Sequence, residues 1–583
     1  MAVASVVALS SNTIIHANAI DYVLIALYFA FVLGIGVMAS RNVSGSVDFF
    51  LSGRSLPAWV TGLAFISANL GAVEIMGMSA NGAQFGLPSV HYFWVGAIPA
   101  MLFLGVVMMP FYYGSKVRSV PEFMLRRFGT GAHLVNAISF AVAQLLIAGV
   151  NLYLLGSIVH ALLGWPLWVA LIVAAIIVLS YITLGGLRAA IYNEVLQFFV
   201  IVAALAPLTL IGLHRVGWWS GLKDKMAPLT DTKTHEVTAA VSRQLHSWPG
   251  NALTEFHSSF LSVIGIVFGL GFVLSFGYWT TNFVEVQRAL ASDSISSARK
   301  TPIIGAFPKM FVPFITIIPG MIAAVLVPEM AQLKAGHAPT VAGDKVKYND
   351  AILLLMRDVL PNGLLGLAIT GLLAAFMAGM AANISAFNTV LSFDLVQTYV
   401  VKNKPDSWYL GIGRWATVGA TVVAIFTASL ASNFDNIMNY LQTLFGFFNA
   451  PLFATFILGM FWKRMTATAG WIGLVAGTVS AVAVAFLSEG VFGSASTGTL
   501  PLHGQGASFV AAGVAFVVDV VLSVVVSLVT KPKPATELVG LVYSETPREQ
   551  RIDPLEATYP WYRRTVPLAG VALVLVIVLN FLF

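Results

Sequence analysis

The sequence predicts an all-α integral membrane protein with about fourteen transmembrane helices. Of its 583 residues, 58% are hydrophobic and only 10% are charged, whereas a soluble protein carries about 25% charged residues. Apolar runs of the roughly 20 residues that cross a bilayer also recur along the chain. The expected spans lie near 20–39, 57–80, 88–113, 132–160, 165–184, 190–213, 257–284, 301–328, 359–396, 411–430, 437–461, 466–487, 508–530 and 566–583.

The basic residues predict the orientation. With the N-terminus outside, the short cytoplasmic loops and the adjoining span ends contain fifteen Lys and Arg residues. The short external loops near 81–87, 161–164, 431–436 and 488–507 contain none. Because basic residues stay on the cytoplasmic side, we expect a multi-pass protein of the plasma (inner) membrane with both termini extracytoplasmic.

Several features that the sequence lacks narrow the function. It contains no Cys, so disulfides and thiol chemistry are excluded, and no GxxxxGK[ST] motif, which argues against an ATP-driven pump. Without HExxH or a convergent His pair, an intramembrane enzyme is disfavoured, and we expect no cofactor. The first ten residues lack a basic region, so we expect no cleavable signal peptide. The net charge of +6 follows from the topology and predicts no nucleic-acid partner.

Residues 62–79 combine a span-like apolar character with three glycines, Asn69 and Glu74. Helix breakers and polar groups at membrane depth are costly unless they line a cavity. We therefore expect the backbone to be unwound around Asn69, as in transporters that bind a solute within the membrane. Tight helix packing through small residues is the alternative, but it does not explain Glu74.

A second polar cluster lies in 271–288, where we expect the backbone to be unwound around Ser275. Tyr278 and Trp279 could stack on an apolar ring face, or they could belong to an interfacial aromatic belt. Gln442, at the start of a later span, could be a solute ligand or make an interhelical hydrogen bond.

Few ionisable residues remain inside the spans. Glu74 and Lys309 could be counter-ions of each other, or each could face the solute. Asp519 lies mid-span with no acid or base nearby, which favours a helix contact. Glu194 and Asp394 lie nearer to span ends. A charge at this depth costs a few kcal/mol, so each group needs a partner, water or an altered protonation state.

Five motifs in this order resemble the sodium:solute symporter family, most closely its bacterial sodium/galactose branch. The resemblance runs from about Asp48 to Leu487. The motifs begin at Ser52 (Ser-Gly-Arg-Ser-Leu-Pro), Gly185 (Gly-Gly-Leu-Arg-Ala, with Asn-Glu-Val-Leu-Gln from Asn193), Gln287 (Gln-Arg-Ala-Leu-Ala), Lys309 (Lys-Met-Phe-Val-Pro-Phe) and Gly459 (Gly-Met-Phe-Trp-Lys-Arg).

The resemblance implies a leucine-transporter-type fold with two inverted repeats of five helices each. The implied organisation is an N-terminal extra helix and cytoplasmic loop (1–56), a first repeat (57–213), an external loop (214–256), a second repeat (257–461), two accessory helices (462–530), a cytoplasmic linker (531–565) and a C-terminal helix (566–583). The linker is rich in Pro and charge, so we expect a solvated tether, with a regulatory role as the alternative.

The resemblance also implies a substrate site. Residue types are retained at Asn69, Tyr92, Tyr278, Trp279, Lys309 and Gln442. Three positions differ: Glu74 stands where the branch has glutamine, Phe93 where it has glutamate, and Ser275 where it has asparagine. Losing the glutamate removes an acceptor for sugar hydroxyls, so galactose itself is disfavoured, and a sugar or another small polar solute remains open.

For the cation, the resemblance implies backbone carbonyls at Ser67, Leu70 and Ala375, with hydroxyls at the positions of Ala378 and Gly379. This chain has neither hydroxyl, and a hard cation prefers several oxygen ligands. Na⁺ is the expected coupling ion, while H⁺ coupling through Glu74 and uncoupled transport stay open. Glu194 matches an aspartate near the inward cation exit.

Together these observations predict a secondary transporter that couples a cation, expected to be sodium, to import of a small polar solute by alternating access. A proton-coupled or facilitative carrier, and a symporter of an organic acid or amino acid, are the alternatives within this class. A membrane solute sensor is the alternative from another class. The expected partners are the solute, the coupling cation and the lipid bilayer.

Overall fold

The computed structural model describes residues 13–40, 54–115, 117, 119–226, 244–489, 496–547, 551 and 553–583. Ser52 of the first motif and residues 227–243 of the expected external loop therefore lie outside the described residues. The described chain is helical apart from a hairpin of β1 (Thr340–Val341) and β2 (Asp344–Lys345). This agrees with the all-α class predicted from composition.

The first half of the chain holds α2 (Ala19–Ser40), α4 (Ala58–Asn69), α5 (Ala72–Phe85), η2 (Leu87–Val90), η3 (Tyr92–Ala97), α6 (Ile98–Phe103), η4 (Leu104–Met108), α7 (Met109–Gly114), α8 (Val120–Phe128), α9 (Thr130–Leu163), α10 (Leu167–Val216), α11 (Trp218–Met226) and α13 (Asn251–Thr254). The second half holds α14 (Ser259–Ile264), η5 (Gly265–Ser275), α15 (Phe276–Thr281), α16 (Phe283–Leu290), α17 (Ile295–Lys309), α18 (Val312–Leu326), α19 (Pro328–Lys334), η6 (Tyr348–Asp350), α20 (Ala351–Val359), α21 (Leu364–Thr389), η7 (Val390–Val400), α22 (Asp406–Ala431), α23 (Ile437–Phe461), α24 (Ala467–Leu487), α25 (Gly504–Val529), four short 3₁₀ turns between Ala535 and Arg563, and α27 (Thr565–Leu582).

Among the described residues, 11 helices are long and apolar enough to cross a membrane, or 12 if the bent pair α4–α5 counts as one span. The remaining two expected spans fall on shorter apolar segments, Ala19–Ile35 and Leu167–Ile176. The second of these belongs to α10, which covers both 165–184 and 190–213 in one helical element. The expected count of fourteen is therefore not confirmed.

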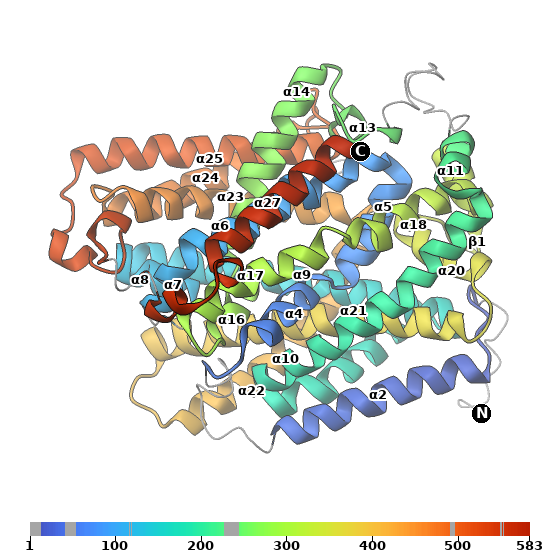
Figure 1. Cartoon of the computed structure of the whole chain (residues 1–583), viewed down its shortest axis with the longest axis horizontal. Helices are drawn as coiled ribbons and strands as arrows, with labels where there is room; N and C mark the ends of the chain where they lie inside the picture. The colour runs from blue at the N-terminus through green and yellow to red at the C-terminus, as the bar shows by residue number, and fades with distance from the viewer. Residues whose placement is uncertain are drawn as a thin grey trace.

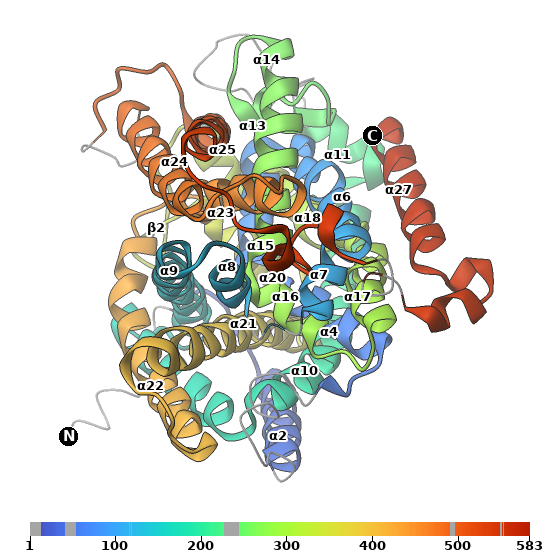
Figure 2. The same cartoon turned by 90° about the vertical axis from the view of Figure 1, so that its left-hand side faces the viewer.

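The broken span α4–α5 lies within the bundle. Helix α4 packs along α17, α5 packs along α18, and both contact α21. In both views α2 and the pair α24–α25 lie on opposite edges of the bundle, with α21 between them (Figures 1 and 2). This arrangement surrounds the break with helices from distant parts of the sequence.

The expectation of unwound backbone around Ser275 is wrong. The helix continues through Ser275 as a π-helical segment, η5, and is interrupted only at Asn282. The Asn282 side chain accepts a hydrogen bond of 3.0 Å from the Val284 N–H and so caps α16. Glycines at 265, 269 and 271 add no side-chain bulk to the widened π turns, whereas a capping asparagine begins a new helix.

The described part of the linker 531–565 contacts the membrane helices, so the expectation of a solvated tether is wrong for it. Arg299 donates to Glu556 at 2.9 Å, and Lys300 lies 4.3 Å from the ring centre of Tyr559. Burial alone would raise the pKa of Glu556, but hydrogen bonding from Thr565 and the Arg299 charge hold it below its usual value. The linker is thus fixed beside the start of α17, and it leads into α27 on the outside of the bundle (Figure 2).

Candidate functional site

A cavity of about 120 Å³ lies beside the break between α4 and α5. All nine residues predicted to bind substrate line it, although they come from α4, α5, η3, η5, α15, α17 and α23: Asn69, Glu74, Tyr92, Phe93, Ser275, Tyr278, Trp279, Lys309 and Gln442. Sequence positions up to 373 residues apart (Asn69 to Gln442) are therefore brought to one place. Polar side chains and aromatic faces both border the space.

The break itself is a tight turn. Helix α4 ends at Asn69, α5 begins at Ala72, and the two axes are bent by 54°. The Gly71 N–H donates to the Asn69 carbonyl at 2.7 Å, which ends the regular helical hydrogen bonding. A β-carbon at Gly71 would lie 3.3 Å from the α-carbon of Gly379, so glycine here permits close packing of the break against α21.

An ion pair crosses one wall of the cavity. The Lys309 ammonium donates to the carboxylate of Glu74 and to the side-chain oxygen of Asn69. The ammonium also lies 5.0 Å from the ring centre of Phe93 and 5.2 Å from that of Trp279. The carboxylate, the amide oxygen and the two aromatic faces all stabilise the buried cation.

A second hydrogen-bonded group adjoins this ion pair at the cavity. The Tyr278 hydroxyl donates to Glu285 at 3.0 Å and accepts from the Asn69 amide at 3.0 Å. Asn69 thus links the Lys309 ion pair to Tyr278. Tyr92 points its hydroxyl away to Gln505 of α25, at 2.5 Å.

Gln442 and Ser275 border the cavity, and their side chains make no hydrogen bond to another residue in the described part of the chain. An amide on a cavity wall with no protein partner can bond to a guest molecule. Phe93 contributes only its ring, so this wall lacks the acceptor that a carboxylate would supply.

The predicted cation positions surround the contact between the break and α21. The Ser67 hydroxyl is buried and has no hydrogen-bond partner among the described residues. Ala378 and Gly379 bring no side-chain oxygen, as the sequence requires. A β-carbon at Gly379 would lie 3.2 Å from Oδ1 of Asn151, another buried oxygen that no described residue binds.

The orientation of Asn151 follows from its other hydrogen bond. Its second amide atom lies 3.1 Å from the Ile147 carbonyl, which can only accept, so that atom is the nitrogen. The oxygen therefore faces Gly379. Buried oxygens without donors, next to carbonyls freed by a helix break, are ligands suited to a hard monovalent cation.

Comparison with known proteins identifies the family. The model of the sodium:solute symporter family matches residues 49–477. The chain belongs to this family. Over 484 residues it is 28% identical to a sodium/glucose cotransporter of Vibrio parahaemolyticus, covering 80% of this chain and 85% of the relative. It is also 28% identical over 562 residues to sodium/glucose cotransporter 4 of Danio rerio, covering 93% and 83%.

A solved structure described as a Na⁺-coupled sialic acid symporter, in a substrate-bound outward-open state, matches with a TM-score of 0.68. The match has 18% sequence identity and covers 88% of this chain and 99% of that chain. This likeness shows the fold, which is the leucine-transporter type expected from the motifs. It does not test the predicted site residues or the repeat boundaries, which stay predictions.

Glu194, predicted to lie on the cation exit path, is bound to arginine in this symporter. Arg288 donates to both of its carboxylate oxygens, at 2.5 and 3.3 Å, and also to the Val284 carbonyl at 2.9 Å. Both charged side chains are buried. A cation could therefore reach this carboxylate only if the Arg288 contact opened.

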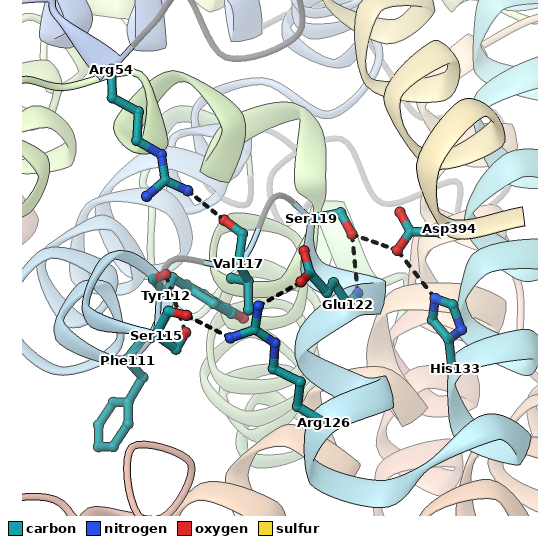
Figure 3. A network of polar contacts seen from close by, with 10 residues as sticks. All are labelled: Arg54, Phe111, Tyr112, Ser115, Val117, Ser119, Glu122, Arg126, His133 and Asp394. Carbon is teal, nitrogen blue, oxygen red and sulfur yellow. Dashed lines mark hydrogen bonds and ion pairs between the residues drawn. The ribbon is translucent and has the colours of Figure 1, made fainter. Parts of the chain in front are cut away.

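Two further acids of the symporter hold helices together. Asp519 accepts hydrogen bonds of 2.8 Å from Thr455 of α23 and from Ser523, in agreement with the predicted helix contact. Asp394 accepts from Ser119 at 2.8 Å and contacts His133 at 3.1 Å, which joins η7 to the start of α8 and to α9 (Figure 3).

Two residues of the site were not predicted. Glu285 lies just past the end of the expected span 257–284, where an acid looks like part of a cytoplasmic loop. Asn151 lies mid-span in 132–160, and its amide in an apolar run was a usable signal, because such groups cost free energy unless they are bonded.

Proposed function

We propose that this chain is a sodium-coupled symporter that carries a small polar solute, sugar-like or otherwise polyhydroxylated, across the plasma membrane by alternating access, with both termini outside the cytoplasm. The observation that carries the proposal is the broken span α4–α5, which borders a cavity together with Lys309, Tyr278 and Gln442. Irregular backbone at membrane depth is tolerated where it lines such a site.

The chemistry of the cavity supports a solute with several hydroxyl groups. Asn69, Ser275 and Gln442 offer amide and hydroxyl groups, while Trp279 and Phe93 offer ring faces. Hydroxyls bond to the first kind of group, and the apolar face of a sugar ring stacks on the second. Since Phe93 supplies no acceptor, we expect galactose to bind more weakly than a solute that does not need one there.

The Lys309–Glu74 pair favours a second candidate, a zwitterionic solute such as an amino acid. A carboxylate on the solute could take the place of Glu74 beside Lys309, and an ammonium could take the place of Lys309 beside Glu74. Each buried charge would keep a partner throughout the exchange, as its desolvation requires.

Sodium would bind between the break and α21. The proposed ligands are the carbonyls of Leu70 and Ala375, and the Ser67 residue through its carbonyl and its unpartnered hydroxyl. Asn151 would supply the side-chain oxygen that Ala378 and Gly379 lack. Sodium that stabilises the outward-open state raises solute affinity, and linkage requires the solute to raise sodium affinity equally.

The test is uptake into proteoliposomes of labelled D-glucose, D-galactose, sialic acid and a panel of amino acids, under a gradient of NaCl or of choline chloride. A symporter accumulates one of them only with NaCl, a facilitator equilibrates it with either salt, and a sensor binds it without uptake. Accumulation driven by a pH gradient alone would contradict sodium coupling.

A variant pair on α23 tests the cavity. Gln442→Ala should weaken uptake, while Thr443→Ala, the next residue, serves as the matched control because its hydroxyl bonds to Ser508 away from the cavity. Equal uptake in the two variants would remove Gln442 from the site.

A further inference from the structure

Glu285 is a buried carboxylate for which the function proposed above has no use. It lies in the first turn of α16, directly after the Asn282 interruption, and its side chain is fully buried. One oxygen accepts from the Tyr278 hydroxyl at 3.0 Å and lies 3.5 Å from the Asn69 amide. The other oxygen has no hydrogen-bond partner among the described residues.

The charges around Glu285 do not balance. Lys309 is paired with Glu74, and Arg288 is paired with Glu194. Three buried acids thus share two bases, and Glu285 is the acid left over. A buried carboxylate without its own counter-charge costs several kcal/mol, far more than a neutral carboxyl group.

Among the described residues, the helices packed against α16 do not supply the missing charge. Helix α16 packs against α4, α7, α15, α17 and α21. Helices α4, α7, α15 and α21 contain no acidic or basic residue. Helix α17 supplies Lys309, while its Arg299 is bound to Glu556 and its Lys300 lies over Tyr559. On its own helix, Glu285 faces Arg288, which is held by Glu194.

We propose that Glu285 is a proton-binding site, and that the Tyr278 hydroxyl controls its occupancy. While Tyr278 donates to the first oxygen, the charged form is stabilised by a hydrogen bond to an anion. When Tyr278 moves away, that stabilisation is lost and the second oxygen takes a proton from water. The proton returns to water when the hydrogen bond forms again, so only one O–H bond is made and broken.

The proposal rests on the carrier function because Tyr278 also borders the cavity. A solute that displaces Tyr278 would change proton binding at Glu285, and linkage would make solute affinity depend on pH. Sodium-driven uptake that is indifferent to pH would overturn this inference and leave the proposed function intact.

The direct test needs no identified solute. Infrared difference spectra of the purified full-length protein are recorded between about pH 5 and about pH 9, in NaCl and in choline chloride. The C=O band of protonated buried carboxyl groups should decrease as pH rises, and the part contributed by Glu285 should be missing in Glu285→Gln, so that the band of this variant is smaller. The control Glu537→Gln, an exposed acid of the linker, should keep the band.

Tyr278→Phe provides a second measurement in case Glu285→Gln does not fold. Removing the hydroxyl donor should raise the midpoint of the band by about one pH unit, because a hydrogen bond to a charged group is lost. A band of unchanged size in Glu285→Gln, or a midpoint unchanged in Tyr278→Phe, would overturn the proposal. A band that NaCl abolishes at constant pH would also overturn it, because sodium would then be the occupant.

Discussion

The Lys309–Glu74 pair gives the sharpest prediction about stability. Both side chains are buried, with 2% and 10% of their surfaces exposed. Lys309→Met keeps an unbranched side chain of similar size but removes the ammonium, together with its contacts with Phe93 and Trp279, and so leaves the Glu74 carboxylate without a counter-charge. Breaking a buried pair in this way costs about 3–5 kcal/mol.

The same reasoning predicts that the double variant recovers. Glu74→Gln alone removes the counter-charge of Lys309 and leaves its ammonium with neutral amide oxygens and two ring faces, so it should also lower the melting temperature. In Lys309→Met with Glu74→Gln no charge is left unpaired, and replacing both partners of a buried pair is often neutral. We therefore expect a coupling free energy of roughly 2–4 kcal/mol in the double-mutant cycle.

The assay is thermal unfolding of the four purified proteins in one detergent, followed by intrinsic tryptophan fluorescence. The reasoning would be refuted if both single variants had the melting temperature of the wild type. It would also be refuted if the stability lost in the double variant equalled the sum of the losses in the two single variants. Either result would mean that the pair is separated in solution, for example by water that enters the cavity.

The remaining predictions concern the cation, the helix contacts and the linker. Asn151→Ala should raise the sodium concentration needed for a given stabilisation by about fivefold to a hundredfold, because a lost oxygen ligand costs about 1–3 kcal/mol. Equal melting curves of the variant and the wild type in NaCl titrations would exclude Asn151 as a ligand. Asp519→Ala should cost about 1–3 kcal/mol, since Thr455 on the facing helix loses its acceptor, and a wild-type melting temperature would contradict this. Arg299→Ala should release the linker and speed its cleavage by protease. Contacts lower the pKa of Glu556 in the folded protein, so its charged form stabilises the fold above the usual glutamate pKa of about 4.3. This stabilisation is lost as the pH falls through the lowered pKa of the folded state. Cleavage of the wild-type linker should therefore rise only in acid.

The membrane-protein fold class, the helix break at Asn69 and the charged residues of the cavity wall could be predicted from the sequence for physical reasons. Hydropathy marks spans because unpaired backbone groups cannot face lipid. Glu74 and Lys309 stood out because charges at that depth are rare, and their pairing follows from the cost of leaving either alone. The motif order then placed Tyr278 and Gln442, which the structure brings to the same cavity.

Other features could not be predicted because they depend on packing. A glycine-rich run is compatible with a break or with π turns, so Ser275 was expected at an interruption that the structure has at Asn282. In the sequence, Glu285 resembles an acid of a cytoplasmic loop. Only the packing of α16 against α4 shows that its carboxylate lies next to Asn69. The 50 residues of α10 cover two expected spans, because helical backbone continues through the predicted loop.

The missing hydroxyl at position 379 is best understood together with Asn151. A β-carbon at 379 would lie 3.2 Å from the Asn151 oxygen and 3.4 Å from the α-carbon of Gly71. The close packing of α9, α21 and the break therefore leaves little room for a side chain at this position. A serine at 379 would require the amide to withdraw, and a glycine lets it fill the gap. In the sodium site that we propose, the side-chain oxygen would therefore come from α9 instead of α21. A bound ion would then join α9 to the break between α4 and α5, so that its release would free α9 from the broken span.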